Sequence, residues 1–191
     1  MKKKHPKKGQ YGYRNYHKKT ELALIFSGLA AILLQLGARQ FTDRESLKNI
    51  LTVMAIVSAL PIANVASPFL ASFRYRTPGP EFYQKLSAYE DKTAVLYDLI
   101  LTSKEQIMPM DGVCVHPSGV YFYCTNPKVK TEQAEAFLND MFRAHRLDPH
   151  AKVITDEKAF FKRADSLKPA EEYEDDGSVG YTIQLLKDLS M

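Results

Sequence analysis

The chain has 191 residues, of which 45% are hydrophobic and 25% charged, a length that allows one ordinary soluble domain besides any membrane segments. Its net charge of +4 is unevenly spread: residues 1–20 carry eight Lys and Arg side chains and no acid, whereas residues 77–191 carry 13 basic and 19 acidic side chains, a balance of −6. An acidic C-terminal part argues against a nucleic-acid partner, and two cysteines are too few for a secreted scaffold built on disulfides.

Residues 1–20 are predicted to form a basic cytoplasmic tail. Basic side chains next to a membrane segment are attracted to anionic lipid head groups, by about 1 kcal/mol for each charge near the surface. Tyrosines interleave with these charges, a pattern also found in segments that bind nucleic acid, so that alternative stays open. The residues expected to face lipid are Lys2, Lys3, Lys4, Lys7, Lys8, Lys18 and Lys19.

Two uncharged runs, residues 22–38 and 49–73, lie within residues 21–74. Crossing about 30 Å of hydrocarbon takes about 20 helical residues at about 1.5 Å each, so each run is long enough to span a bilayer. We therefore expect a hairpin of two transmembrane helices in the cell (plasma or inner) membrane, which makes the protein multi-pass. Two alternatives remain, a cleaved signal peptide for the first run and a buried hairpin of a soluble protein.

The basic residues predict how this hairpin is oriented. Eight precede the first run, three lie in the loop, and Arg74 and Arg76 follow the second run. The positive-inside rule then places both termini in the cytoplasm. Reduced, unpaired Cys114 and Cys124 agree with that compartment.

Small residues recur in both runs and are candidates for close helix packing. The common occurrence of alanine in membrane helices is an equally acceptable explanation. The candidates are Gly28 and Ala31 in the first run, and Ala55, Ala59, Ala63 and Ser67 in the second.

A proline-containing linker, residues 75–80, is followed by a predicted domain over residues 81–168, and residues 169–191 form an acidic linker and a C-terminal element. Hydrophobic periodicity predicts a small cytoplasmic α/β domain with the order α-β-β-β-α-β. Its elements are a helix over 81–91, a strand or helix over 94–101, strands over 110–115 and 120–125, a helix over 130–146, a strand over 151–155, a short helix over 156–167 and a strand or helix over 179–189.

The sequence His116-Pro117-Ser118-Gly119 predicts a tight turn between the two central strands. With Pro117 and Ser118 as the loop, Val115 lies opposite Val120, and counting back places Asp111 opposite Cys124 and Cys114 opposite Tyr121. The side chains of Asp111, Val113, Val115, Val120, Phe122 and Cys124 then share one face of the sheet. The two thiols lie on opposite faces, so we expect both to be free.

The segment MDGVCVHPSGVYFYCTNPK, together with the helix TEQAEAFLNDMF and the strand AKVIT that follow it, resembles the core of the PD-(D/E)XK nuclease superfamily, and most closely its NERD (nuclease-related domain) branch. The resemblance covers residues 81–155 and implies a restriction-endonuclease-like fold. It makes Asp111 the candidate metal-binding carboxylate. At the positions where the family has Glu and Lys, this chain has Cys124 and Asn126.

A nuclease of this type needs two carboxylates for Mg²⁺ and a Lys beside the attacking water, so one Asp and a thiol make a poor site. The resemblance therefore implies a domain that has lost catalysis, with no metal or other cofactor. Asp98 is a possible second carboxylate for Asp111. His145, Asp148 and His150 lie close together in the sequence, where the end of a helix with surface histidines explains them.

Three functions are compatible with these features. We expect a membrane-anchored protein whose non-catalytic nuclease-like domain binds a protein partner, forms homo-oligomers or acts as a scaffold. One alternative is a membrane-tethered, metal-dependent nuclease-like enzyme that uses Asp111. The other is a small accessory subunit of a membrane complex.

Overall fold

The computed structural model describes residues 5–174 and 176–191 and divides into two compact units. One unit comprises residues 15–74, and the other combines the described residues up to Arg14 with those from Tyr75 onward. This division differs from the predicted boundaries, because residues 5–14 belong with the sheet-containing unit and do not form a separate tail.

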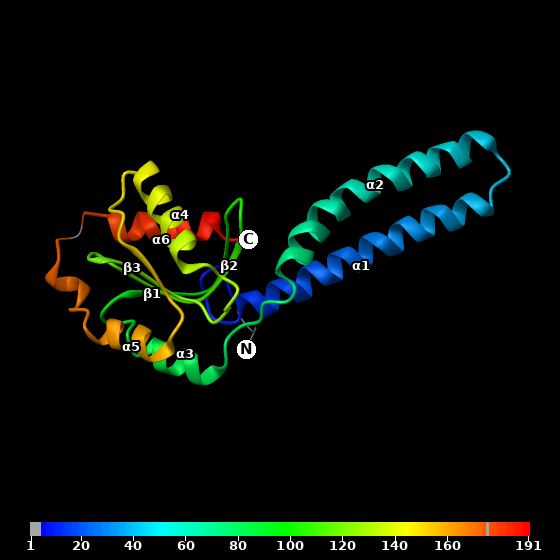
Figure 1. Cartoon of the computed structure of the whole chain (residues 1–191). Helices are drawn as coiled ribbons and strands as arrows, with labels where there is room; N and C mark the ends of the chain where they lie inside the picture. The colour runs from blue at the N-terminus through cyan, green and yellow to red at the C-terminus, as the bar shows by residue number, and fades with distance from the viewer. Residues whose placement is uncertain (1–4, 175) are drawn as a thin grey trace. The chain divides into compact units, whose positions relative to one another are not determined.

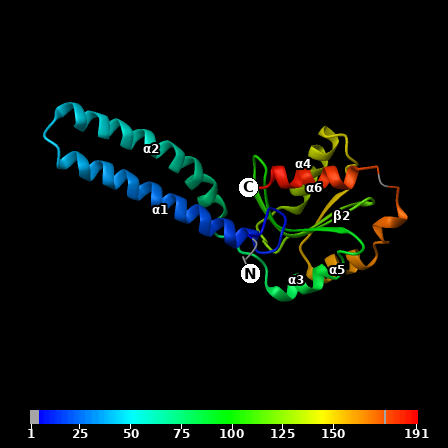
Figure 2. The same ribbon diagram turned by 180° about the vertical axis from the view of Figure 1, so that it is seen from behind.

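The first unit is a helical hairpin formed by α1 (Tyr13–Gln40) and α2 (Glu45–Ser72), whose antiparallel helices lie side by side in both views (Figures 1 and 2). Each helix is long and apolar enough to cross a membrane. Only 6% of each apolar window is buried, so these side chains face outward, in contrast to those of a core helix in a soluble protein. Pro61 and Pro68 lie inside α2 without ending it.

The less exposed positions of each helix, such as 25, 28, 32 and 35 in α1, are spaced alternately three and four residues apart, as in an antiparallel coiled coil. A Cβ atom on Gly28 would lie 2.5 Å from the Ile62 side chain, so glycine lets the two helices approach closely there. About two turns further along α1 from Gly28, the Gln35 amide donates to the Ser58 hydroxyl at 3.3 Å. Of the predicted helix-packing residues, Gly28 and Ala55 lie on this face, whereas Ala31, Ala59, Ala63 and Ser67 are exposed on the isolated hairpin.

The second unit is built on a four-stranded mixed sheet with the strand order β1-β2-β3-β4. The strands β1 (Ala94–Thr102), β2 (Ile107–His116) and β3 (Gly119–Tyr123) form an antiparallel meander, and β4 (Ala151–Ile154) pairs parallel to β3. The remaining elements are α3 (Pro80–Ser87), α4 (Thr131–Ala144), α5 (Glu157–Asp165), the 3₁₀ helix η1 (Ala170–Glu172) and α6 (Ser178–Leu189). The predicted order α-β-β-β-α-β is confirmed. Of the two segments predicted as a strand or a helix, 94–101 forms a strand (β1) and 179–189 forms a helix (α6).

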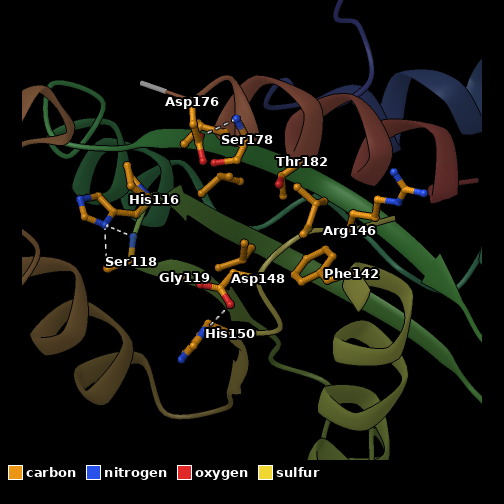
Figure 3. Close-up of a pocket in the computed structure, with 15 residues that line it drawn as sticks. His116, Ser118, Gly119, Phe142, Arg146, Asp148, His150, Asp176, Ser178 and Thr182 are labelled. Carbon is orange, nitrogen blue, oxygen red and sulfur yellow. Dashed lines mark hydrogen bonds and ion pairs between the residues drawn. The ribbon is translucent and has the colours of Figure 1, made fainter. Parts of the chain in front are cut away.

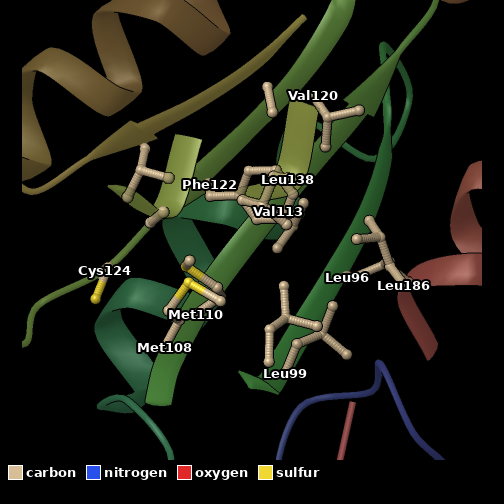
Figure 4. Close-up of a cluster of buried hydrophobic side chains, with 14 of the residues drawn as sticks. Leu96, Leu99, Met108, Met110, Val113, Val120, Phe122, Cys124, Leu138 and Leu186 are labelled. Atoms are coloured by element: carbon tan, nitrogen blue, oxygen red, sulfur yellow. The ribbon is translucent and has the colours of Figure 1, made fainter. Parts of the chain in front are cut away.

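Helices cover both faces of the sheet (Figures 1 and 2). Helices α4 and α6 pack on one face through a cluster that contains Phe122, Leu138 and Leu186, part of which is drawn in Figure 4. Helices α3 and α5 pack on the other face through a cluster that contains Phe82, Leu86 and Phe160. Each helix has an apolar stripe at helical spacing, and burial of that stripe against the sheet is what stabilises it.

The predicted register of the central hairpin is confirmed, since Val115 pairs with Val120 and Cys114 with Tyr121. Val113, Val115, Val120, Phe122 and Cys124 all belong to the cluster under α4 and α6. Cys114 belongs to the opposite cluster, and both thiols are free and buried.

Strand alternation is interrupted where β1 and β2 face each other at Asp98 and Asp111. Leu96 and Leu99, three residues apart, contact the same core cluster, which a regular strand does not allow. Asp98 has a left-handed backbone with φ of 58°, which is uncommon for a non-glycine residue. The β1–β2 ladder pairs the residues on both sides of Asp98 and skips Asp98 and Asp111 themselves.

The two edges of the sheet are covered from within the chain. At β1, the Tyr97 amide donates to the Gly9 carbonyl at 2.9 Å, and the Ile100 amide donates to the Ser190 hydroxyl at 3.0 Å. At β4, side chains of α4 accept from the edge amides, Asn139 from Ala151 at 2.8 Å and Glu135 from Val153 at 2.9 Å. These bonds occupy donors that a partner strand would need for pairing.

Candidate functional site

The sequence-predicted carboxylates Asp98 and Asp111 lie opposite each other at the break between β1 and β2. Both are buried, with exposed fractions of 1% and 4%. Two carboxylates in such a place require cations or hydrogen-bond donors, because an uncompensated buried charge is strongly unfavourable.

The compensating cation is Arg14, which is itself only 3% exposed. Its Nη1 donates to Asp111 Oδ1 at 2.8 Å and to the Arg76 carbonyl at 2.8 Å. Its Nη2 donates to the carbonyls of Leu99 and Met110 at 3.1 and 2.9 Å. The guanidinium therefore occupies the break in the ladder and satisfies carbonyl groups on both strands.

Asp98 binds two chain segments, the one that contains Gly12 and Arg14 and the one that contains Thr77. Its Oδ2 accepts from the Gly12 amide at 2.8 Å, the Arg14 amide at 3.3 Å and the Thr77 hydroxyl at 2.8 Å. Its Oδ1 has no hydrogen bond among the described residues and lies 3.9 Å from Arg14 Nε. Burial raises the pKa of Asp98 above its usual value, and the adjacent Arg14 guanidinium opposes that shift.

Asp111 is held by the chain that follows β3. Its Oδ2 accepts from the Thr125 amide at 3.0 Å and from the Thr125 hydroxyl at 2.6 Å. With Oδ1 bonded to Arg14, both oxygens of this carboxylate have protein partners. The site is thus a closed network of one guanidinium, two carboxylates and two threonines.

Cys124 and Asn126, at the family's Glu and Lys positions, take no part in this network. The Cys124 thiol is fully buried in the apolar cluster, and burial raises its pKa to about 11, so it remains a neutral thiol. The Asn126 side-chain oxygen accepts from the Lys128 amide at 3.1 Å in the turn that precedes α4. Among the described residues no group of three or more His, Cys, Asp or Glu side chains is placed to hold a metal ion.

Sequence reasoning missed Arg14, because it treated residues 1–20 as one basic tail. The available signal was chemical: Arg14 is the single arginine among eight basic residues there. A planar guanidinium with five donors suits a buried multidentate site, whereas lysine suits a hydrated surface.

The lysines that the structure describes among residues 1–20 are divided between the two units. Lys8 donates from Nζ to the carbonyls of Lys187 (3.3 Å) and Ser190 and so contacts the sheet-containing unit. Lys7 is exposed there, while Lys18 and Lys19 belong to α1 in the hairpin unit. Lys2, Lys3 and Lys4 lie outside the described residues.

A separate cleft of about 420 Å³ opens beside the β2–β3 turn (Figure 3). His116 and Ser118 line it from the turn, Arg146, Asp148 and His150 from the connection after α4, and Ser178 and Thr182 from α6. The sequence cluster of His145, Asp148 and His150 does not converge on one point. His145 Nδ1 lies 3.0 Å from the Tyr181 hydroxyl, whereas His150 pairs loosely with Asp148 at 3.7 Å.

Comparison of the chain with family models, with curated proteins and with solved structures finds no match.

Proposed function

We propose that this protein is a membrane-anchored scaffold whose sheet-containing domain binds a protein partner and lacks metal-dependent nuclease chemistry. The observation that carries the proposal is Arg14, whose guanidinium lies between the carboxylates on which that chemistry would depend.

The charge and geometry of the site support a structural role for Asp98 and Asp111. A Mg²⁺ ion needs octahedral oxygen ligands at about 2.0–2.1 Å and open positions for water or substrate. Here Asp111 is saturated by Arg14 and Thr125, and Asp98 Oδ2 by two amides and a hydroxyl. The Arg14 guanidinium therefore supplies the positive charge that a metal ion would otherwise provide.

The same network supports the anchoring part of the proposal. Gly12 and Arg14 precede the hairpin in the sequence, Arg76 and Thr77 follow it, and all four bond to each other or to Asp98. The two chain segments that flank the hairpin are thus joined at one buried point within the domain. Both chain connections to the hairpin therefore start from the same buried network of the domain.

The alternative, a nuclease-like enzyme at Asp111, is favoured by one observation: within the described part of the chain, Asp98 Oδ1 accepts no hydrogen bond. The test is to incubate the full-length protein in detergent micelles with supercoiled DNA or with RNA, in Mg²⁺ or Mn²⁺. We expect the wild type and Arg14→Ala each to cleave nucleic acid no faster than Asp111→Ala does. Cleavage by either protein that disappears when Asp111→Ala is introduced would contradict the proposal and establish the enzyme.

A further inference from the structure

The β2–β3 turn contains a serine and a histidine in direct contact. His116 Nδ1 lies 2.7 Å from Ser118 Oγ, and His116 Nε2 lies 2.9 Å from the Lys168 carbonyl oxygen. A carbonyl oxygen only accepts hydrogen bonds, so Nε2 carries the ring proton. The Nδ1 lone pair therefore faces Ser118, whose hydroxyl and amide (3.1 Å) both donate to it.

The two side chains differ in exposure in the way that a nucleophile and its base require. His116 is 3% exposed and packs edge-on against the Tyr173 ring at a centroid distance of 5.0 Å. Burial lowers the pKa of His116 below its usual value, which keeps the ring neutral at pH 7. Ser118 is exposed at the tip of the turn and can be reached from solvent.

The cleft next to this pair provides room for a small molecule. Its apolar wall includes Val120 and Phe142, and Gly119 and Ser178 belong to the same lining. Arg146 lines the cleft well away from His116 and Ser118 in the view of Figure 3. Its guanidinium has no ion pair or hydrogen bond within the described part of the chain, so it is available to an anionic end of a bound molecule.

We propose that Ser118 is a nucleophile that accepts an acyl group from a small ester or thioester bound in this cleft. Its base is His116, which the Lys168 carbonyl orients. A nucleophile in hydrogen-bond reach of a base, which a third group orients, is the arrangement common to enzymes that form covalent acyl intermediates. The inference goes beyond the scaffold role and depends neither on the membrane anchor nor on Arg14.

The reaction needs His116 to carry a proton and water to release the acyl group. Ser118 Oγ forms a bond to the acyl carbon while its proton passes to His116 Nδ1. The bond from that carbon to the leaving oxygen or sulfur breaks, and the leaving group takes the proton from Nδ1. Water then attacks the acyl-serine by the same route, which releases a carboxylic acid and restores Ser118.

The probe is p-nitrophenyl acetate, applied to the full-length protein in detergent micelles. Release of p-nitrophenol is followed spectrophotometrically, and acetylated residues are mapped by peptide mass spectrometry. We expect acetyl on Ser118, and its formation should be lost in Ser118→Ala, which removes the hydroxyl and leaves the backbone amide as a donor to His116 Nδ1. Ser87→Ala is the matched control, because Ser87 lies on α3 outside the cleft and its hydroxyl donates to the Gln84 carbonyl, so this variant should behave as the wild type.

His116→Gln tests the base, and it should slow acetylation of Ser118 by about 100-fold or more, the usual contribution of general-base catalysis. Circular dichroism checks that this variant is folded, and Ser118→Ala keeps the inference testable if it is not. Acetylation of Ser118 in the wild type no faster than that of other exposed serines would overturn the inference and leave the His116–Ser118 pair as a cap of the turn. Neither result affects the nuclease test at Asp111.

Discussion

Arg14 shows how one side chain can replace several ladder hydrogen bonds. It donates to Asp111 and to three main-chain carbonyls on different segments, including one on each of β1 and β2. Arginine suits this position because its guanidinium presents several donors in one plane and stays charged when buried. The other basic residues among residues 1–20 are all lysines, whose point charge cannot serve as many acceptors at once.

Replacing Arg14 by alanine should destabilise the sheet-containing unit by about 3–5 kcal/mol, since it leaves buried carboxylates without a cation. Arg14→Lys should lie between this variant and the wild type. The readout is pulsed labelling of Cys114 and Cys124 during a urea titration of the full chain in micelles, because both thiols are fully buried in that unit and report its unfolding. Arg143→Ala, which removes an exposed arginine paired with Asp140, is the control and should cost about 0.5 kcal/mol or less.

The effect of Arg14→Ala should depend on pH. Burial raises the pKa of Asp98, and removing the guanidinium removes the cation that opposes this shift. A carboxyl whose pKa is raised by folding contributes stability below its unfolded value of 3.8, and this contribution is lost as the pH rises through the folded pKa. The deficit of Arg14→Ala should therefore shrink on acidification towards pH 4, and a deficit that grows there would contradict the role given to Arg14.

At the scale of the elements, the sheet leaves little room for a partner to bind by adding a strand. Residues of the N-terminal segment and of the C-terminal end of α6 bond to β1, and side chains of α4 bond to β4. Helices cover both faces. A protein partner of the proposed scaffold is therefore expected to contact helices or connections.

In the hairpin, the close approach of α1 and α2 at Gly28 can be tested by adding one methyl group. Gly28→Ala should destabilise the helix pair by about 1–3 kcal/mol, because the new Cβ lies 2.5 Å from the stiff, β-branched Ile62. Gly37→Ala is the matched control: a Cβ atom there meets nothing within 4 Å, so the variant gains helix propensity without a clash.

The measurement is disulfide trapping between cysteines placed on facing positions of the two helices in a background without Cys114 and Cys124. Gly28→Ala should slow trapping relative to Gly37→Ala, and Ile62→Ala should restore it. Equal trapping in both glycine variants would show that the helices do not approach at this point.

At the scale of the whole molecule, the protein combines an apolar hairpin with an acidic domain. The hairpin exposes large apolar side chains along both helices, which in water would be an aggregation hazard and in lipid is the favourable arrangement. If the hairpin spans a membrane, the positive-inside rule predicts cytoplasmic termini.

Reporter fusions in a bacterial host test this topology. A periplasm-active reporter fused after Met191 should be silent, and the same reporter inserted between Phe41 and Arg44 should be active, with membrane association resistant to alkaline carbonate. Release of the chain by carbonate would rule out the spanning hairpin, and an active reporter after Met191 would reverse its orientation.

The sequence by itself determined the features that depend on neighbouring residues. The two apolar helices, the element order and the register of the β2–β3 hairpin follow from local periodicity and turn chemistry, and the register was found as predicted. The same reasoning named Asp98 and Asp111 as a possible pair of carboxylates.

Only the tertiary structure decided what those carboxylates bind. Arg14 and Asp111 are separated by 97 positions, and no periodic pattern links them. Likewise, the exposed positions of Ala59, Ala63 and Ser67 depend on which face of α2 meets α1. A buried carboxylate is paired by whichever cation the fold brings close to it, and the face of a helix that becomes buried is set by the helix that packs on it. Both depend on contacts between distant residues, which local sequence spacing does not encode.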